Sequence, residues 1–133
     1  MKHLKRIISV LVLVVLMPTA YPHGAHHNVV VEIDYGGKHP FREIEVEWHQ
    51  GMTALEALQS VANIETKQIN GFILVTSIDG VEWQSGNMAW YYDVNGERAE
   101  DFADRCVLSE GDHMRWSFTK DVCSPKMDKE VRK

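Results

Sequence analysis

Three histidines near the start of the chain have the side chains that bind metal ions: His23, His26 and His27 lie in the segment YPHGAHHN. Clustered histidines are typical ligands of copper and zinc. If the mature chain starts two residues before His23, a terminal copper chelate needs a backbone N–H at the second position, and Pro22 has none. We therefore predict that residues 21–28 form a flexible leader, and we keep metal capture by the three histidines as an alternative.

Residues 1–20 have the layout of a secretory signal peptide. Three basic residues precede an uncharged apolar run over residues 7–17, and a short segment then ends at Ala20. The run is shorter than the roughly 20 residues that a membrane-spanning helix needs. We expect cleavage after Ala20, which gives a secreted or periplasmic protein without a stable membrane anchor.

Cys106 and Cys123 are the two cysteines of the chain. In an oxidising compartment an even pair forms a disulfide more often than a metal or catalytic site. We predict a Cys106–Cys123 disulfide that tethers the charged tail to the last strand. The loop it closes would contribute about 3 kcal/mol to the free energy of unfolding.

The charge of the chain argues against nucleic-acid binding. Residues 1–20 carry three of the 14 basic residues and none of the 19 acidic ones, so their removal lowers the net charge from −5 to about −8 with histidine neutral. A protein this acidic does not attract phosphate backbones, and no basic cluster with interleaved aromatic residues is present. We expect no nucleic-acid partner.

Catalytic motifs are absent from the sequence. It contains no nucleophile elbow, phosphate-binding glycine loop, HExxH motif or CxxC pair. His39, His49 and His113 are scattered, and a single histidine near carboxylates is more often a surface group than a general base. We predict a protein that is not an enzyme and requires no cofactor.

Two apolar, aromatic-rich runs dominate the middle of the chain. Residues 72–78 end at Asp79-Gly80, and residues 88–94 end at Asn95-Gly96. Such runs are typical of strands, and the two turn pairs tolerate the positive φ of a tight hairpin. We predict that both strands form the centre of one sheet. Alternation along the second strand places Met88, Trp90, Tyr92 and Val94 on one face and Ala89, Tyr91 and Asp93 on the other.

The flanking segments predict a hairpin and a further strand. Residues 29–35 and 41–48 are turned by a glycine pair, and the second segment alternates apolar and polar side chains. Residues 113–119 predict the last strand of the domain. The acidic row on the second segment is interpreted as a solvated strand face: Glu43, Glu45 and Glu47.

A short helix is predicted between the hairpin and the central strands. Thr53 and Glu56 have the spacing of a capping box, and apolar residues recur at helical spacing up to Ala62. Residues 63–70 predict a polar connector. One helix packed across a mixed sheet of four to five strands is the β-grasp plan, so we predict an α+β, β-grasp-like domain over residues 29–119. A charged tail, residues 120–133, follows it.

Several motifs in this order resemble the transcobalamin-like C-terminal domain family and its bacterial DUF4430 relatives. They are GMTALEAL from Gly51, TSIDG from Thr76, WYYDVNG from Trp90, and Gly111-Asp112 ahead of the last strand. The resemblance covers residues 29–119 and implies the β-grasp fold. It also implies a function, because in the cobalamin carriers of this family the domain closes over one face of the vitamin.

The resemblance extends to individual positions. Trp90 falls where the carriers have a tryptophan, Thr76-Ser77 falls in the turn before their ligand-facing loop, and Ala103-Asp104 resembles the pair ahead of their last strand. The carriers also have a helical barrel domain, which this sequence lacks. The domain would then bind the ligand weakly by itself, dimerise, or dock on a separate partner protein or domain.

These observations predict an exported, non-catalytic module that binds a corrinoid such as cobalamin, or another flat amphipathic small molecule. Aromatic surface with a few hydroxyl or amide groups suits such a ligand. The predicted ligand-binding residues are Thr76, Ser77, Trp83, Asn87, Met88, Trp90 and Tyr92.

Two alternatives stay open. Met88, Trp90 and Tyr92 could be core residues under the helix, whereas Trp83 and Asn87 lie in a loop where recognition is the commoner role. The domain could also bind an envelope protein or a polysaccharide through a sheet edge or this loop, since β-grasp domains host many functions. Trp83 and Trp90 in one concave patch would favour the small ligand, and opposite faces would favour the interaction module.

Overall fold

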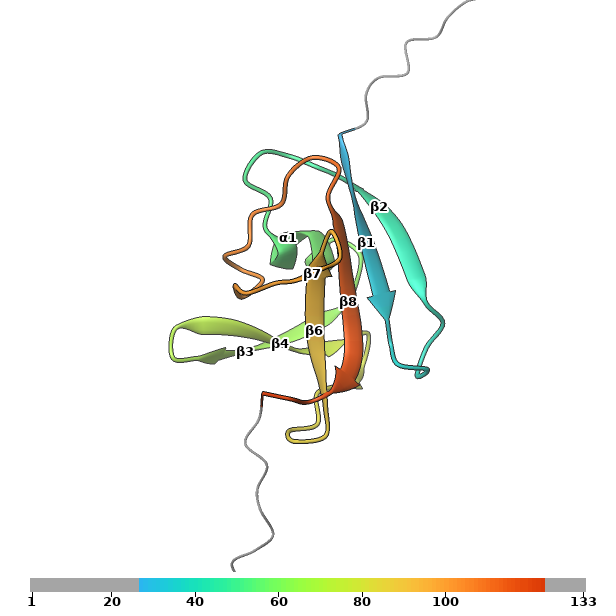
Figure 1. The fold of residues 1–133 in the computed structure, drawn as a ribbon, viewed down its shortest axis with the longest axis vertical. Helices are drawn as coiled ribbons and strands as arrows, with labels where there is room; N and C mark the ends of the chain where they lie inside the picture. The colour runs from blue at the N-terminus through green and yellow to red at the C-terminus, as the bar shows by residue number, and fades with distance from the viewer. Residues whose placement is uncertain (1–26, 124–133) are drawn as a thin grey trace, which may run out of the picture.

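The computed structural model describes residues 27–123, which form two β-sheets and one short helix (Figure 1). The five-stranded sheet contains β1 (Asn28–Asp34), β2 (Arg42–Glu47), β6 (Met88–Val94), β7 (Glu97–Arg98) and β8 (His113–Lys120). The three-stranded sheet contains β3 (Ile64–Ile69), β4 (Phe72–Ile78) and β5 (Val81–Glu82), and helix α1 spans Ala54–Gln59. The predicted signal peptide, His23 and His26 lie outside the described residues, as do residues 124–133 of the predicted tail.

Strand β8 lies at the centre of the five-stranded sheet, whose order is β2-β1-β8-β6-β7. It runs parallel to β1 and antiparallel to β6, so the sheet is mixed, as predicted. Alternate β8 side chains, Met114, Trp116 and Phe118, are at most 4% exposed, whereas His113 and Arg115 are exposed. Because side chains alternate along a strand, one face of this sheet belongs to the core and the other faces solvent. We call the second one the open face.

The predicted hairpin at the start of the domain is confirmed. Strands β1 and β2 pair antiparallel, with Val31 opposite Ile44, and alternate apolar side chains, such as Val31 of β1 and Val46 of β2, pack in the core. The acidic row of β2 is exposed on the open face, as predicted: Glu43, Glu45 and Glu47.

The centre of the domain differs from the prediction in two ways. Residues 63–70 are not a connector, because Ile64–Ile69 form strand β3, which pairs with β4 through the turn Asn70-Gly71. Strands β4 and β6 do not form the centre of one sheet but belong to different sheets. The β3–β4 hairpin projects to one side, across the direction of β6 (Figure 1). Strand β3 has mostly exposed side chains, so it lacks the apolar alternation that would have identified it.

Both predicted tight turns are confirmed by their backbone angles. Asp79 and Gly80 have φ of 49° and 81°, and Asn95 and Gly96 have φ of 53° and 80°. Two successive positive φ values are typical of the type I′ turn, which matches the twist of the flanking strands. The same geometry at Asn70 and Gly71, with φ of 51° and 82°, produces the hairpin that the sequence interpretation missed.

Helix α1 begins where the sequence predicts and ends early. The Thr53 side chain accepts a hydrogen bond from the Glu56 N–H at 3.1 Å, as an N-cap should. The Glu56 carboxylate contacts His49 instead of closing the capping box, with 2.9 Å between the His49 Nε2 and Glu56 Oε1 atoms. The last turn tightens at Ser60, whose hydroxyl donates to the Ala57 carbonyl, so the helix does not reach the predicted end.

The predicted disulfide is not present, since Cys106 and Cys123 are both free cysteines. The Cys106 thiol lies beside the Tyr92 hydroxyl, whereas the Cys123 N–H donates to the Tyr91 hydroxyl at 3.2 Å. Tyr91 and Tyr92 are neighbours on β6, so their side chains point to opposite sides of the strand. The two cysteines therefore contact tyrosines on opposite faces of β6.

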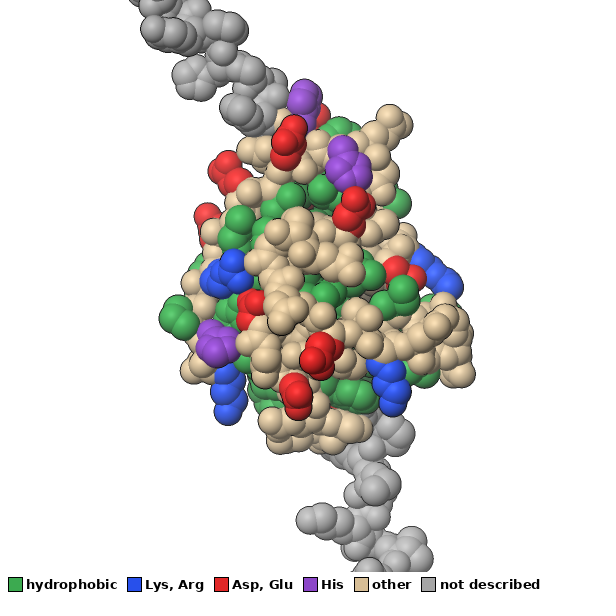
Figure 2. Space-filling model, turned by 180° about the vertical axis from the view of Figure 1, so that it is seen from behind, with side chains coloured by type: hydrophobic (Ala, Val, Ile, Leu, Met, Phe, Trp, Pro, Cys, Tyr) green, Lys and Arg blue, Asp and Glu red, His purple; other side chains and the backbone are tan. Residues whose placement is uncertain are grey.

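Acidic and basic side chains are interspersed on the surface seen in Figure 2, and apolar side chains are visible between them. Within residues 27–123, no helix is long and apolar enough to cross a membrane.

Candidate functional site

A groove of about 620 Å³ runs along β6, between the β3–β4 hairpin and the segment 98–103. This volume lies in the range of small-molecule sites, roughly 300–1,000 Å³. The lining is mainly apolar and aromatic, and includes Ile69, Phe72, Ile73, Val75, Trp83, Ala89, Trp90, Tyr91, Tyr92, Phe102 and Trp116. A concave, mainly apolar surface with a few polar groups is the usual form of a ligand site.

The edge of β6 is accessible to the groove because β7 covers only the end of that strand. Strand β7 pairs with Asp93 and Val94, whereas β8 pairs with β6 along its whole length on the other side. At the start of β6, Gln84 forms an isolated bridge with Met88. The middle of the strand, around Trp90, therefore borders the groove with its backbone.

The floor of the groove is a set of packed aromatic rings. The Trp90 ring lies 5.1 Å from that of Phe118, and its Nε1 donates to the Val81 carbonyl at 2.8 Å. Tyr92 stacks on Trp116 with 4.8 Å between ring centroids. Trp90 is 5% exposed and Tyr92 7%, so both are core residues that also line the groove.

The Tyr92 hydroxyl is fixed below the groove as a neutral donor. It donates to the Asp101 carbonyl at 2.5 Å. Burial, followed by the neighbouring Cys106 thiol, raises the pKa of Tyr92 above its ordinary value. The neutral ring therefore contributes apolar surface to the groove.

Asp121 organises one end of the groove. Its carboxylate, in a residue that is 7% exposed, accepts from the Trp83 Nε1 at 3.2 Å, the Gly86 N–H at 2.9 Å and the Tyr91 hydroxyl at 3.2 Å. The Asp121 N–H also donates to the Asn87 carbonyl. These bonds hold the half-buried Trp83 at the groove.

Asp121 was missed because it lies in the segment interpreted as a charged tail. Lys120 belongs to β8 and Asp121 is buried, so the folded domain extends past the predicted boundary at residue 119. An aspartate within a charged segment carries no local signal that it will be buried. Only the packing of the loop between β5 and β6 against β8 gives it that role.

The groove contains three of the seven predicted ligand-binding residues: Trp83, Trp90 and Tyr92. Ser77 is buried at 3% exposure, and the Thr76 carbonyl accepts from the Trp83 N–H at 2.7 Å. Asn87 is exposed and donates from its side chain to Gln84, and Met88 is half-buried. These four residues shape the β4–β5–β6 region but do not line the groove.

The tip of the β3–β4 hairpin is fastened to the opposite wall. The rings of Phe72 and Phe102 stack with 4.6 Å between centroids. The Arg105 guanidinium lies 4.5 Å from the centre of the Phe72 ring and donates to the Gly71 carbonyl at 3.2 Å. Ile69 and Phe102 are 39% and 37% exposed, so they form an apolar rim.

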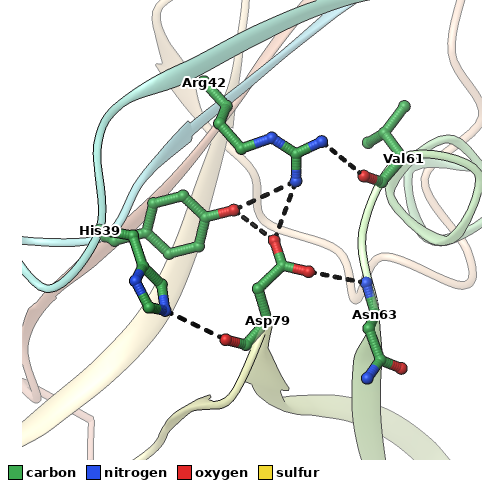
Figure 3. Close-up of polar contacts among 6 residues, drawn as sticks. His39, Arg42, Val61, Asn63 and Asp79 are labelled. Carbon is green, nitrogen blue, oxygen red and sulfur yellow. Dashed lines mark hydrogen bonds and ion pairs between the residues drawn. The ribbon is translucent and has the colours of Figure 1, made fainter.

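A polar cluster ties the base of the same hairpin to the five-stranded sheet (Figure 3). The Asp79 carboxylate accepts from the Tyr35 hydroxyl, from the Arg42 Nη1 at 3.0 Å and from the Asn63 N–H at 2.9 Å. The Arg42 Nη2 also donates to the Val61 carbonyl at 2.9 Å. We call Tyr35, Arg42 and Asp79 the strut.

The strut favours an ionised aspartate. Burial raises the pKa of Asp79, but hydrogen bonds from Tyr35 and Asn63 and the charge of Arg42 outweigh burial, so the pKa lies below its ordinary value. Burial, followed by the bond to Asp79, raises the pKa of Tyr35. The strut therefore holds an Arg42–Asp79 ion pair and a neutral tyrosine.

Metal ligands do not gather in the described part of the chain. Within residues 27–123, no group of three or more histidine, cysteine or acidic side chains could hold a metal ion. His27, the one described member of the predicted metal-binding trio, is exposed and pairs with Glu110.

The sequence matches the model of a domain of unknown function, DUF4430, over residues 51–120. The chain belongs to the DUF4430 family. The matched segment runs from the start of α1 to the end of β8, so it holds nearly all of the groove lining. This confirms the family resemblance that the sequence motifs indicate. No curated protein sequence matches the chain.

Two solved structures are similar to this DUF4430 protein in fold. A "putative metal binding protein" from Ruminococcus gnavus has a TM-score of 0.56 and 17% identity, over 71% of this chain and 97% of that chain. Haptocorrin in complex with Cbi has a TM-score of 0.58 and 16% identity, over 69% of this chain and 25% of that chain. The DUF4430 chain thus corresponds to about a quarter of the haptocorrin chain. At these identities the likeness concerns the fold alone.

Proposed function

We propose that this DUF4430 domain is a non-catalytic binding module for a corrinoid, and that the groove along β6 is its site. The observation that carries the proposal is the joint position of Trp83, Trp90 and Tyr92 in one concave, mainly apolar groove. Tryptophan and tyrosine supply large, rigid contact area with polar edges, which suits a flat macrocycle that carries polar substituents.

The fold supports the choice of a corrinoid over other flat ligands. Haptocorrin, whose structure contains Cbi, shares this fold over 69% of the present chain. We assign the fold to the β-grasp type on the same ground. The arrangement of Trp83 and Trp90 in one patch is also the arrangement expected for a small ligand rather than for an interaction surface on opposite faces.

The groove suits contact with one side of the ligand. It is open, and its walls are the β3–β4 hairpin and the segment 98–103. We propose that a separate partner protein or domain covers the other side of the corrinoid. We further propose that the protein acts after export, since residues 1–20 have the pattern of a signal peptide.

A calorimetric titration of the mature protein with dicyanocobinamide and cyanocobalamin tests the proposal. We expect saturable binding that weakens about tenfold or more in Trp83→Ala, because removing an aromatic anchor from a groove typically costs more than 1 kcal/mol of binding free energy. Trp83 is half-buried at the groove rather than in the centre of the core, so the variant should fold, which circular dichroism checks.

Phe41→Ala is the matched control. Phe41 is an exposed aromatic residue that lies under Arg115 and does not line the groove. Its removal should leave the affinity unchanged. Absence of heat with both ligands at about 100 μM, which corresponds to less than roughly 5.5 kcal/mol of binding free energy, would contradict the proposal and favour the interaction module.

A further inference from the structure

Trp90, in the middle of β6, directs its backbone N–H and C=O groups toward the groove. The Tyr92 carbonyl accepts from the Ala99 N–H at 3.1 Å, and Met88 exchanges backbone hydrogen bonds with Gln84 at 2.9 Å and 2.8 Å. Tyr92 and Met88 therefore direct their backbone groups away from β8. In an antiparallel strand, alternate residues direct these groups to the same side. Trp90, which lies between them, must also present its N–H and C=O to the outer edge.

The backbone N–H and C=O of Trp90 have no hydrogen-bond partner within residues 27–123. Gln84 pairs with both backbone groups of Met88, and the Ala99 N–H pairs with the Tyr92 carbonyl, but nothing in the described chain pairs with the backbone of Trp90 on this side. A second unpaired donor lies in the same lining: the Trp116 Nε1 is buried and has no partner in the described structure. Buried polar groups are nearly always paired with protein, water or ligand.

The charges around the groove restrict what can supply the missing partners. Three acidic residues, Glu100, Asp101 and Asp121, line it with a single basic one, Arg98, which is paired with Asp93 at 3.0 Å. A ligand carboxylate would be repelled by these acidic residues. Its oxygens would also face the Trp90 carbonyl, which is itself a hydrogen-bond acceptor. A neutral group with one donor and one acceptor side by side avoids both penalties.

We propose that the groove recognises its ligand through a carboxamide that pairs with the backbone of Trp90. The amide N–H donates to the Trp90 carbonyl, and the amide oxygen accepts from the Trp90 N–H. This completes the edge of β6 as a neighbouring strand would. The inference rests on the proposed function, since it names the part of the corrinoid that the groove selects: a peripheral carboxamide rather than an ester or a carboxylate.

The test compares two ligands on the unaltered protein, which avoids variants that would not fold. Dicyanocobinamide carries carboxamides, and the methyl ester of dicyanocobyrinic acid carries esters in their place, which accept hydrogen bonds but cannot donate them. The ester should bind about tenfold more weakly, because it leaves the Trp90 carbonyl unpaired. Equal affinity would overturn the carboxamide assignment and leave the proposed function standing. Failure of both compounds to bind would overturn the two together.

Amide hydrogen exchange locates the contact. The Trp90 N–H should exchange about tenfold more slowly in the presence of saturating dicyanocobinamide, because a new hydrogen bond protects it. The Tyr91 N–H, which faces β8, serves as the internal reference and should change little. Saturable binding that leaves exchange at Trp90 unchanged would contradict the assignment.

Discussion

The two faces that meet at β6 differ in how their polar groups are satisfied. On the open face, Arg115 pairs with Asp34 at 3.0 Å and approaches Glu32 at 3.8 Å, and the acidic row of β2 is exposed to solvent. On the groove side, aromatic rings surround backbone and indole groups that have no partner in the described chain. Charged groups that are paired within the domain or are exposed to solvent need no ligand. A groove with unmatched hydrogen-bonding capacity is the better candidate for recognition.

The largest expected effect comes from the floor of the groove. Trp90→Ala removes a ring that contacts Tyr35 and Phe118 and breaks the bond to the Val81 carbonyl. We expect the free energy of unfolding to fall by about 3–5 kcal/mol, as for large-to-small changes in a core. Urea denaturation measures it. A loss below 1 kcal/mol would mean that Trp90 is not part of the core.

The strut should give the next largest effect. Asp79→Ala leaves the Tyr35 hydroxyl and the Asn63 N–H without their acceptor, and we expect a loss of about 1–3 kcal/mol in the free energy of unfolding. Ligand affinity should fall with it, since the strut holds the hairpin that forms one wall of the groove. Urea denaturation and calorimetry measure the two effects, and the surface variant Glu45→Ala should change neither.

The strut also predicts a dependence of stability on pH. The folded protein holds the pKa of Asp79 below its unfolded value of 3.8. The contribution of ionised Asp79 to the free energy of unfolding is therefore complete above pH 3.8 and is lost as pH falls through the lower folded pKa. The free energies of unfolding of the wild-type protein and of Asp79→Asn, measured as a function of pH, should converge below pH 3.8. Curves that stay parallel through that range would contradict the ion pair.

A smaller and more selective effect is expected at the end of the groove. Asp121→Asn removes the charge that holds Trp83, Gly86 and Tyr91, and should weaken dicyanocobinamide binding about tenfold by loosening Trp83. Asp34→Asn on the open face is the matched control and should bind normally. Equal effects of the two substitutions in calorimetry would remove the distinction between the faces.

The smallest effect is expected on the open face itself. Arg115→Ala breaks pairs in which the arginine is 49% exposed, so the free energy of unfolding should fall by no more than about 1 kcal/mol. Affinity for the corrinoid should be unchanged in calorimetry. A loss of binding comparable to that of Trp83→Ala would place the site on the wrong face.

The parts of the fold that were predictable have signals within a few residues. Asp79-Gly80, Asn95-Gly96 and the Thr53 cap are local chemistry, and the β1–β2 hairpin follows from alternation between a core and a solvated face. Strand β3 had the same turn signal in Asn70-Gly71, but its exposed side chains gave no alternation to accompany it.

The candidate site is built from contacts between distant segments, which no local sequence pattern reveals. The aromatic residues Trp83, Trp90 and Tyr92 were found because large rings on a strand and in its loop are candidates for either a core or a site. Asp121 and the rim at Ile69 and Phe102 arise from segments far apart in the sequence. The partition of β4 and β6 into two sheets, which creates the groove, is likewise a property of the packing.

The most direct test of the central claim is an NMR titration of the ¹⁵N-labelled mature protein with dicyanocobinamide. We expect shifts to concentrate at the groove, at the Trp83 and Trp90 indole N–H groups and along residues 98–103, while Glu43, Glu45 and Arg115 on the open face stay unchanged. Shifts centred on the open face, or none at saturating ligand concentrations, would contradict it.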